Sequence, residues 1–177
     1  MAEESGLNPF REVEAPFSSH CRKSRMSLTN QEEGQMKNVE VLMVDDNHGD
    51  VVLMKEAMQA AGLTHNLNVA CDGIEALEYL RLKGKYTGVP RPDIIVLDLK
   101  LPRKAGMEVL EDIQLDPTLR DIPLVILSSS QWELGIAQSR KDSCYNCIVK
   151  PSTFDGYIEL VRNIEAFRKT GQKGGNS

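Results

Sequence analysis

The sequence predicts an α/β fold built on a doubly wound, five-stranded parallel sheet. Five short segments rich in Val, Ile and Leu alternate along the chain with five segments whose apolar residues recur at helical spacing. Most of the apolar segments leave no polar face for water, which is typical of strands that helices cover on both sides. Right-handed crossovers through the helices then leave few topologies.

The strands are predicted from runs of aliphatic and β-branched residues. Residues 39–44, VEVLMV, open the pattern, and residues 93–98, DIIVLD, are its clearest strand. Residues 66–71 alternate enough in polarity for a strand. The short apolar runs at residues 122–128, IPLVILS, and 146–149, NCIV, complete the set of five.

The helices are predicted from apolar residues three and four apart and from the residues that stop them. Helices are expected over residues 47–61, 73–81, 105–115, 131–141 and 153–169. Gly62 and Gly84 follow the first two helices, and Pro117 follows the third. The glycines and prolines of Gly84–Pro92 predict a loop.

The chain divides by composition into three parts. Residues 1–38 mix six acids with five bases and contain few large apolar residues, which predicts a flexible N-terminal arm. This arm is interpreted as a partner-binding or oligomer-swapping tail, as a disordered leader, or as a segment upstream of a start at Met26 or Met36. Residues 39–170 form the predicted domain. The glycine-rich residues 171–177 predict a disordered tail.

Charge and composition exclude several classes of function. A formal net charge of −5 argues against a protein that coats nucleic acid, so no DNA partner is expected. No apolar run approaches the roughly 20 residues of a membrane span, and the acidic N-terminus has no apolar signal-peptide core. Four scattered cysteines do not make a secreted disulfide scaffold. We therefore expect a soluble, cytoplasmic protein without a membrane partner.

Chemically active side chains follow four of the predicted strands. Asp45 and Asp46 follow the first strand, Asp98 ends the third, Ser128 ends the fourth and Lys150 follows the fifth. Because the carboxyl ends of parallel strands meet at one edge of the sheet, these side chains are expected in one pocket. Clustered carboxylates suit Mg²⁺, and a lysine and a hydroxyl suit a phosphoryl group. The set predicts a phosphoryl-transfer site in which a carboxylate can be the nucleophile.

A single aspartate after a strand has a simpler interpretation. It is usually a helix cap or a turn residue, and Asp46 or Asp50 taken alone is interpreted in that way. Capping does not explain acids, a hydroxyl and a lysine at four strand ends together.

Four segments together resemble the receiver domain of two-component response regulators. They are VLMVDDN, IIVLDLKLPRKAGMEVL, VILSSS and IVKP, and the resemblance spans about residues 39–169. It implies the flavodoxin-like strand order 2-1-3-4-5. The segment NHGDVVLMKEAM and the serine run are most similar to small stand-alone regulators that are paired with phytochrome-like and other sensor histidine kinases.

The resemblance implies a role for each residue of the set. Asp98 would accept a phosphoryl group from a phosphohistidine of a sensor histidine kinase. Ser128 would bond a phosphoryl oxygen and move toward it, and Lys150 would pair with the carboxylate at rest and with the phosphoryl group afterwards. Pro102 and Gly106 would shape the loop beside the site. The ligands of Mg²⁺ would be Asp45, Asp46, Asp98 and the backbone carbonyl of Lys100.

Three positions of this sequence are compared with the residues that the family usually has. Cys147 stands three residues before the lysine, where the family often has Tyr or Phe, so a switch by an aromatic side chain is in doubt. Lys100 stands two residues after Asp98, and its long side chain is interpreted either as crowding the attacking water or as simply solvated. The family often has a cis peptide bond at the position of Pro151, which costs little before proline.

The expected function is that of a phosphorylation-dependent signalling switch, not of an enzyme. Only 27 residues follow Lys150, so output is expected through an unknown downstream protein or through phosphotransfer. The faces of residues 131–141, 146–149 and 153–169 are the candidates for that contact or for a homodimer. The alternative is a receiver-like module that binds partners without phosphorylation. A flavodoxin-like carrier is disfavoured by Asp45 and Asp46, and an aspartyl-phosphate phosphatase by Lys100.

Other residues with reactive or aromatic side chains have ordinary interpretations. Cys144 and Cys147 form a C-x-x-C sequence at the start of a strand, so apolar packing is expected rather than redox or metal chemistry. His48 and His65 are expected to be exposed loop histidines. Trp132 is interpreted as a partner contact, a lid or a packing residue.

Overall fold

The computed structural model describes residues 38–139 and 145–171 and confirms the predicted α/β sheet. Five parallel strands lie in the order β2-β1-β3-β4-β5 within these residues. They are β1 (Val39–Val44), β2 (His65–Ala70), β3 (Ile94–Asp98), β4 (Leu124–Ser128) and β5 (Tyr145–Val149). All of the predicted arm except Asn38, and all of the predicted tail except Gly171, lies outside the described residues.

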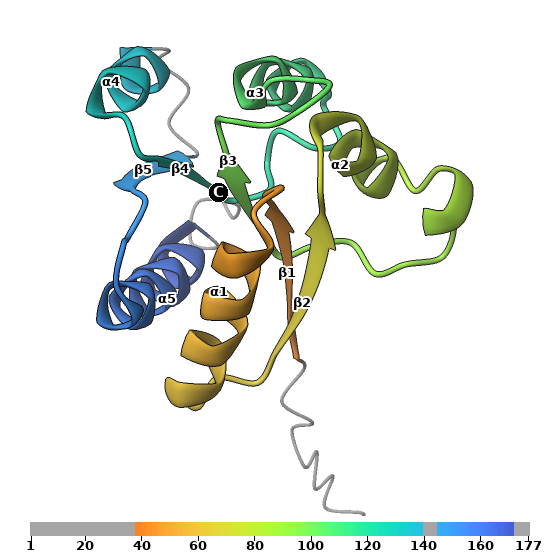
Figure 1. The fold of residues 1–177 in the computed structure, drawn as a ribbon. Coiled ribbons are helices and arrows are strands. Elements are labelled where there is room, and N and C mark those ends of the chain that lie inside the picture. Colours follow the sequence, from red (N-terminus) through yellow and green to blue (C-terminus); the bar gives the residue numbers. More distant parts are fainter. Residues whose placement is uncertain (1–37, 140–144, 172–177) are drawn as a thin grey trace, which may run out of the picture. The chain divides into compact units, whose positions relative to one another are not determined.

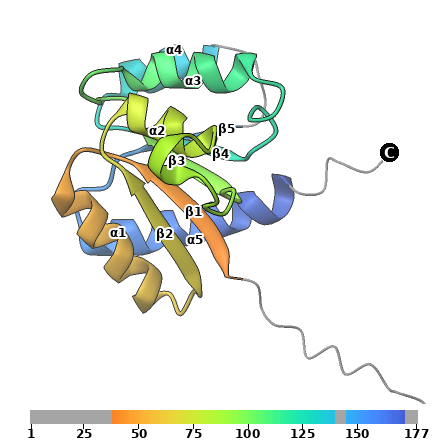
Figure 2. The same cartoon turned by 90° about the vertical axis from the view of Figure 1, so that its right-hand side faces the viewer.

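Helices cover both faces of the sheet. α1 and α5 lie against one face, and α2, α3 and α4 lie against the other (Figures 1 and 2). Their bounds are α1 (His48–Ala60), α2 (Gly73–Leu80), α3 (Gly106–Leu115), α4 (Gln131–Ser139) and α5 (Phe154–Gly171). None of the helices in the described ranges is long and apolar enough to cross a membrane.

Alternation along each strand separates the core into two halves. Successive side chains of a strand point to opposite faces of the sheet. In β3, Ile95 and Leu97 pack with α2, α3 and α4, whereas Ile94 and Val96 pack with α1 and α5. β1 and β4 follow the same rule, so most strand residues are buried from both sides. This explains why the strands read as continuous apolar runs.

The predicted elements are all present, and most ends within the described residues move by one or two residues; the predicted end of the fourth helix, at residue 141, lies outside them. Asn47 is a cap rather than a helical residue, because its side chain accepts a hydrogen bond from the first turn of α1, and Asp72 caps α2, which begins at Gly73 as predicted. β4 begins two residues later than expected, after Pro123, which has no N–H for the ladder. The predicted loop at residues 84–92 contains one short 3₁₀ turn at Gly84–Tyr86.

Glu75 connects α2 to the following loop by hydrogen bonds, and we expect these bonds to make the stability of the protein depend on pH. Its carboxylate accepts hydrogen bonds from Lys85 Nζ (2.7 Å), the Tyr86 hydroxyl (2.6 Å) and the Cys71 amide (2.8 Å). The hydrogen bond from Lys85 is the largest cause that lowers the pKa of Glu75 from 4.5 to about 2. Since the folded pKa lies below the unfolded one, the stabilisation is complete above about pH 4.5 and is lost as pH falls toward 2.

Urea denaturation of wild type and Glu75→Gln at pH 6 and at pH 3 measures this effect. The wild type should exceed the variant in unfolding free energy at pH 6, and the difference should shrink at pH 3. A difference that is the same at both pH values would contradict the assignment.

Candidate functional site

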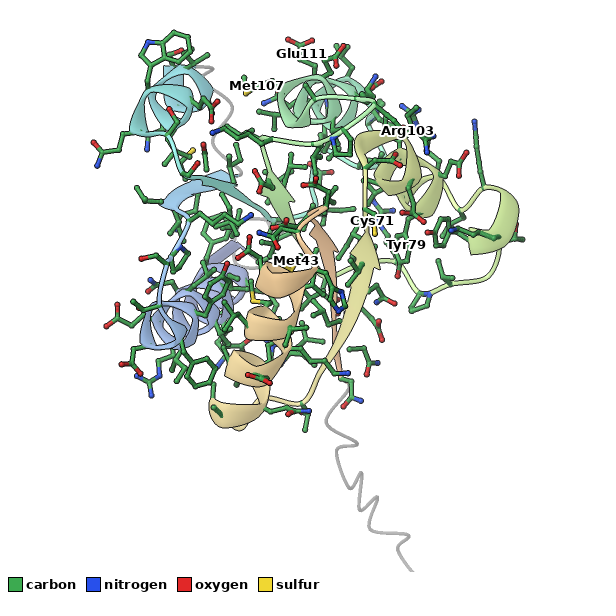
Figure 3. The ribbon with its side chains drawn as sticks, viewed as in Figure 1. Met43, Cys71, Tyr79, Arg103, Met107 and Glu111 are labelled. Carbon is green, nitrogen blue, oxygen red and sulfur yellow. The ribbon has the colours of Figure 1, made fainter. Side chains whose placement is uncertain are left out.

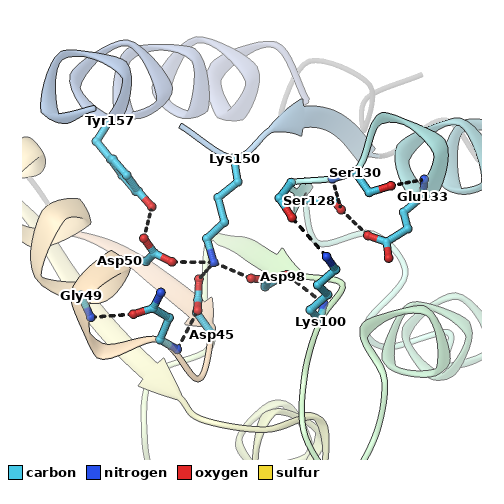
Figure 4. Close-up of polar contacts among 12 residues, drawn as sticks. Asp45, Gly49, Asp50, Asp98, Lys100, Ser128, Ser130, Glu133, Lys150 and Tyr157 are labelled. Carbon is cyan, nitrogen blue, oxygen red and sulfur yellow. Dashed lines mark hydrogen bonds and ion pairs between the residues drawn. The ribbon is translucent and has the colours of Figure 1, made fainter. Parts of the chain in front are cut away.

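The predicted side chains gather at the carboxyl edge of the sheet, but alternation divides them between its two faces. Asp98 continues the row of Ile94 and Val96 toward α1 and α5, and Ser128 continues the row of Ile126 toward α4. Asp45 follows β1, the neighbour of β3, and Lys150 follows the edge strand β5, beyond β4. Both meet Asp98 on the α1–α5 side (Figure 4). The site therefore has a carboxylate half and a hydroxyl half.

Lys150 is the centre of the carboxylate half. Its ammonium nitrogen lies 2.8 Å from Asp45 Oδ2, 2.8 Å from Asp50 Oδ2 and 2.5 Å from Asp98 Oδ2 (Figure 4). The three contacts use all three N–H donors of the side chain. Lys150 is 13% exposed, and Asp45 is 1% exposed. Lys150 and Asp98 are thus in contact in this structure.

The charges of this half do not balance, because three carboxylates face one ammonium. Burial raises the pKa of Asp45 above its ordinary value, although hydrogen bonds from Lys150 and from the Asn47 amide oppose the shift. Burial alone would lower the pKa of Lys150, but its hydrogen bonds to the three carboxylates raise it instead. Lys150 is thus held as a cation, and a net negative charge remains that a further cation can neutralise.

The donor set fits a divalent metal ion in its chemistry. Asp45 and Asp98 offer carboxylate oxygens, which Mg²⁺ prefers, and Asp46 is exposed at the rim, beside Asp45 in a pocket of about 260 Å³. Within residues 38–139 and 145–171, no three acidic, histidine or cysteine side chains are arranged around a metal position. The Lys150 ammonium contacts one oxygen each of Asp45 and Asp98 in this structure, and a carboxylate has further lone pairs with which it can bind a metal ion.

The loop after β3 holds the Asp98 carboxylate from its other side. The Lys100 amide donates to Asp98 Oδ1 at 2.8 Å, and the exposed Lys100 side chain donates to Ser129 Oγ at 3.3 Å. Gly106 begins α3 directly against β3, and its amide donates to the Leu99 carbonyl at 3.1 Å. A Cβ at Gly106 would lie 2.3 Å from the Asp98 carbonyl oxygen, so only glycine fits.

In the hydroxyl half, Ser128 is turned toward α4. The Ser128 hydroxyl donates to the Glu133 carboxylate in the first turn of α4, and it accepts from the Ser130 amide at 3.0 Å. Ser130 caps the same helix: its carbonyl accepts from the Leu134 amide at 3.2 Å and its hydroxyl from the Glu133 amide at 3.4 Å. The structure places the predicted hydroxyl near the site but bonded to α4 rather than to Asp98.

The geometry adds three residues that sequence reasoning missed. Asp50 binds Lys150, Tyr157 donates its hydroxyl to Asp50, and Glu133 binds Ser128. Asp50 was interpreted as a cap, but Asn47 caps α1. Its position one helical turn after the acidic pair is the signal that could have placed it at the same edge. Tyr157 and Glu133 gave no signal beyond helical periodicity.

The structure also tests the expectations for two histidines and for the peptide bond before Pro151. His65 is not an exposed loop residue: it begins β2, its side chain is 4% exposed, and Nε2 lies 3.2 Å from Glu165 Oε2. His48 is exposed as expected, in the first turn of α1. The Lys150–Pro151 bond is trans, since no cis peptide occurs within the described ranges.

The cysteines that the structure describes are far apart. Cys71 is exposed just beyond the end of edge strand β2 (Figure 3), whereas Cys147 lies in the opposite edge strand β5. Cys147 packs partly buried against the core, and burial raises the pKa of its thiol, as apolar packing predicts. Cys144 lies outside the described residues.

Comparison with known proteins shows the family. The response regulator receiver domain matches residues 41–162. The chain is 35% identical over 129 residues to response regulator Rcp1 of Synechocystis sp., covering 72% of this chain and 86% of Rcp1. The protein therefore belongs to the response regulator receiver domain family of two-component signalling, as the resemblance implied.

Solved structures agree with this membership. The phosphorylated cyanobacterial phytochrome response regulator RcpA is 39% identical with a TM-score of 0.66, covering 75% of this chain and 95% of RcpA. The Mn²⁺-bound form of response regulator Rcp1 is 33% identical with a TM-score of 0.63, covering 73% of this chain and 94% of Rcp1. The Mn²⁺ in that relative supports binding of a divalent metal ion in proteins of this kind.

Proposed function

We propose that this protein is a response regulator that accepts a phosphoryl group on Asp98 from a phosphohistidine of a sensor histidine kinase. The observation that carries the proposal is the buried contact of Lys150 with both Asp45 and Asp98 at the end of the parallel sheet. The protein would be a signalling switch of the cytoplasm rather than an enzyme with a separate substrate. Similarity to the cyanobacterial phytochrome response regulator RcpA suggests a phytochrome-type kinase as the donor.

The proposed reaction moves the phosphoryl group from a histidine nitrogen to an aspartate oxygen. The phosphorus–nitrogen bond of the phosphohistidine breaks with its electron pair on the imidazole, which takes a proton from solvent. A phosphorus–oxygen bond forms to an Asp98 carboxylate oxygen. Lys150 neutralises charge on the transferred group. Mg²⁺, held by Asp45, Asp46, Asp98 and the Lys100 carbonyl, would supply the remaining positive charge when bound.

The signal would leave the site through Ser128 and α4. A phosphoryl oxygen on Asp98 competes with Glu133 for the Ser128 hydroxyl, because a hydroxyl has only one hydrogen to donate. Movement of Ser128 would therefore release its bond to α4. This route needs no aromatic side chain at Cys147.

The face formed by α4, β5 and α5 is proposed to receive the downstream protein or a second copy of the chain. It carries Trp132, which is 75% exposed, together with the partly exposed Val149 and Phe154. These are large apolar side chains in contact with water, which a partner protein could cover.

Intact mass tests the proposed acceptor. Wild type and Asp98→Asn are incubated with acetyl phosphate, each with Mg²⁺ and with a chelator. We expect a gain of one phosphoryl group in the wild type with Mg²⁺ only. No gain in the wild type would contradict the proposal and favour a module that binds partners without phosphorylation.

Lys100→Asn is expected to shorten the life of the phosphoryl group. The Lys100 amide binds Asp98 Oδ1, and the Lys100 side chain donates to Ser129 Oγ, so this side chain starts beside Asp98, where it would crowd an attacking water. A shorter side chain should speed phosphoryl loss by roughly threefold to tenfold, or about 1 kcal/mol of barrier. The decay of phosphorylated mass after removal of the donor measures this, with Lys104→Asn in the same loop as the control. An unchanged half-life would overturn the role of Lys100.

A further inference from the structure

A buried chain of contacts continues from Lys150 away from the predicted site. Asp50 Oδ2 lies 2.8 Å from the Lys150 ammonium, and Asp50 Oδ1 accepts the Tyr157 hydroxyl hydrogen at 2.7 Å (Figure 4). Tyr157 is fully buried on α5, and Asp50 lies in the first turn of α1. These hydrogen bonds therefore connect α1 and α5 to Lys150, which contacts Asp45 after β1 and Asp98 at the end of β3.

From this geometry we infer that Asp50 and Tyr157 are positioning residues for the phosphoryl-transfer lysine. Asp50 holds the Lys150 ammonium, and Tyr157 fixes the Asp50 carboxylate in the orientation that does so. The inference rests on the proposed function, since it assigns these two residues a part in that same site.

The three carboxylates around Lys150 have different proposed roles in the reaction. The proposed transfer uses Asp98 as the acceptor, and Asp45 is a proposed metal ligand. Asp50 has neither role: it lies on α1 rather than at the end of a strand, and its second oxygen accepts the Tyr157 hydroxyl hydrogen. When a metal ion and a phosphoryl group occupy the other two carboxylates, Asp50 is the partner that continues to hold Lys150.

The Tyr157 hydroxyl restricts Asp50 to one orientation. An aspartate with one free oxygen can rotate its carboxylate, whereas one held at both oxygens presents a fixed acceptor. Since Tyr157 is part of the core with Leu160 and Val161, its ring cannot move without repacking α5. The position of the lysine is thus set by the packing of α5 as well as by β5.

Tyr157→Phe and Asp50→Asn test the inference against a matched control. Tyr79 is also buried, at 2% exposed, and donates one hydrogen bond, to the Pro90 carbonyl at 3.2 Å. Tyr79→Phe removes the same hydroxyl from α2, on the face of the sheet opposite α1 and α5 (Figure 3). The two tyrosine variants should lose comparable stability in urea denaturation, so they separate positioning from folding.

Two readouts are measured on each protein. The first is the rate of phosphorylation by acetyl phosphate at saturating Mg²⁺. The second is the hydrogen exchange of the Lys150 ammonium, followed by NMR on protein labelled with ¹⁵N-lysine, which reports the position of Lys150 without phosphorylation. We expect phosphorylation to slow about threefold to tenfold in Tyr157→Phe, the effect of one hydrogen bond, and further in Asp50→Asn. Ammonium exchange should be faster in both.

The two tyrosine variants together decide whether the inference holds. Slower phosphorylation and faster ammonium exchange in Tyr157→Phe, with Tyr79→Phe like the wild type, support the inference. Equal effects in the two tyrosine variants, or none in Tyr157→Phe, overturn it while the proposed function stands. A wild type that takes no phosphoryl group overturns the proposed function and this inference together.

Discussion

Replacing Lys150 by methionine is expected to lower the free energy of unfolding by about 3 kcal/mol without divalent metal, since it removes one partner of a buried ion pair. Methionine keeps the length of the side chain but leaves Asp45, Asp50 and Asp98 without the ammonium that they share. Because three neighbouring carboxylates repel one another, each proton or cation that binds there should recover part of the loss.

Urea denaturation with and without Mg²⁺ measures this prediction. Mg²⁺ that binds the folded state alone stabilises it by mass action, so the variant should gain more from Mg²⁺ than the wild type gains. Lys55→Met, at an exposed position of α1, controls for the loss of a surface charge. A Lys150→Met variant as stable as wild type in the absence of metal would show that the ammonium does not offset the repulsion.

Replacing Gly106 by alanine is expected to cost about 3 kcal/mol of stability and to displace the site. The added Cβ would lie 2.3 Å from the Asp98 carbonyl oxygen and 2.6 Å from the Leu99 Cα. Both are backbone atoms of the β3 end, so α3 or the strand must shift, which is the usual cause of large losses on overpacking. Phosphorylation should slow in parallel because Asp98 moves with its backbone.

Gly135 offers a matched control for this substitution. It lies inside α4, is exposed, and a Cβ there meets nothing within 4 Å. Gly135→Ala should raise stability by up to about 1 kcal/mol, because alanine is the better helix former. Thermal unfolding of the two variants should therefore shift in opposite directions. Shifts of the same sign would contradict the close packing of α3 on β3.

The fold could be predicted because burial on both faces leaves a strong pattern. Strands such as Ile94–Asp98 carry almost no polar residue, and their order follows from the family that their motifs resemble. Helix ends are less predictable, since periodicity does not tell whether Asn47 is the first helical residue or the cap before it. The ends therefore moved by one or two residues without changing the topology.

Only those site residues that lie at the end of a strand could be predicted from the sequence. Asp98 and Ser128 end a strand and Asp45 and Lys150 directly follow one, and parallel strands bring these ends together. Asp50 and Tyr157 are 107 residues apart, so their bond depends on how α1 and α5 pack, which periodicity alone does not give. The same holds for His65 and Glu165, whose contact spans 100 residues and made an exposed histidine the wrong expectation.

The most direct test of the central claim is the position of the phosphoryl group in the chain. Protein phosphorylated with acetyl phosphate and Mg²⁺ is reduced with borohydride, which converts an acyl phosphate of aspartate to homoserine, and its peptides are sequenced by mass spectrometry. The account predicts homoserine at residue 98 and aspartate at residues 45, 46 and 50. Homoserine at any of those three positions, or no conversion at residue 98, would contradict it.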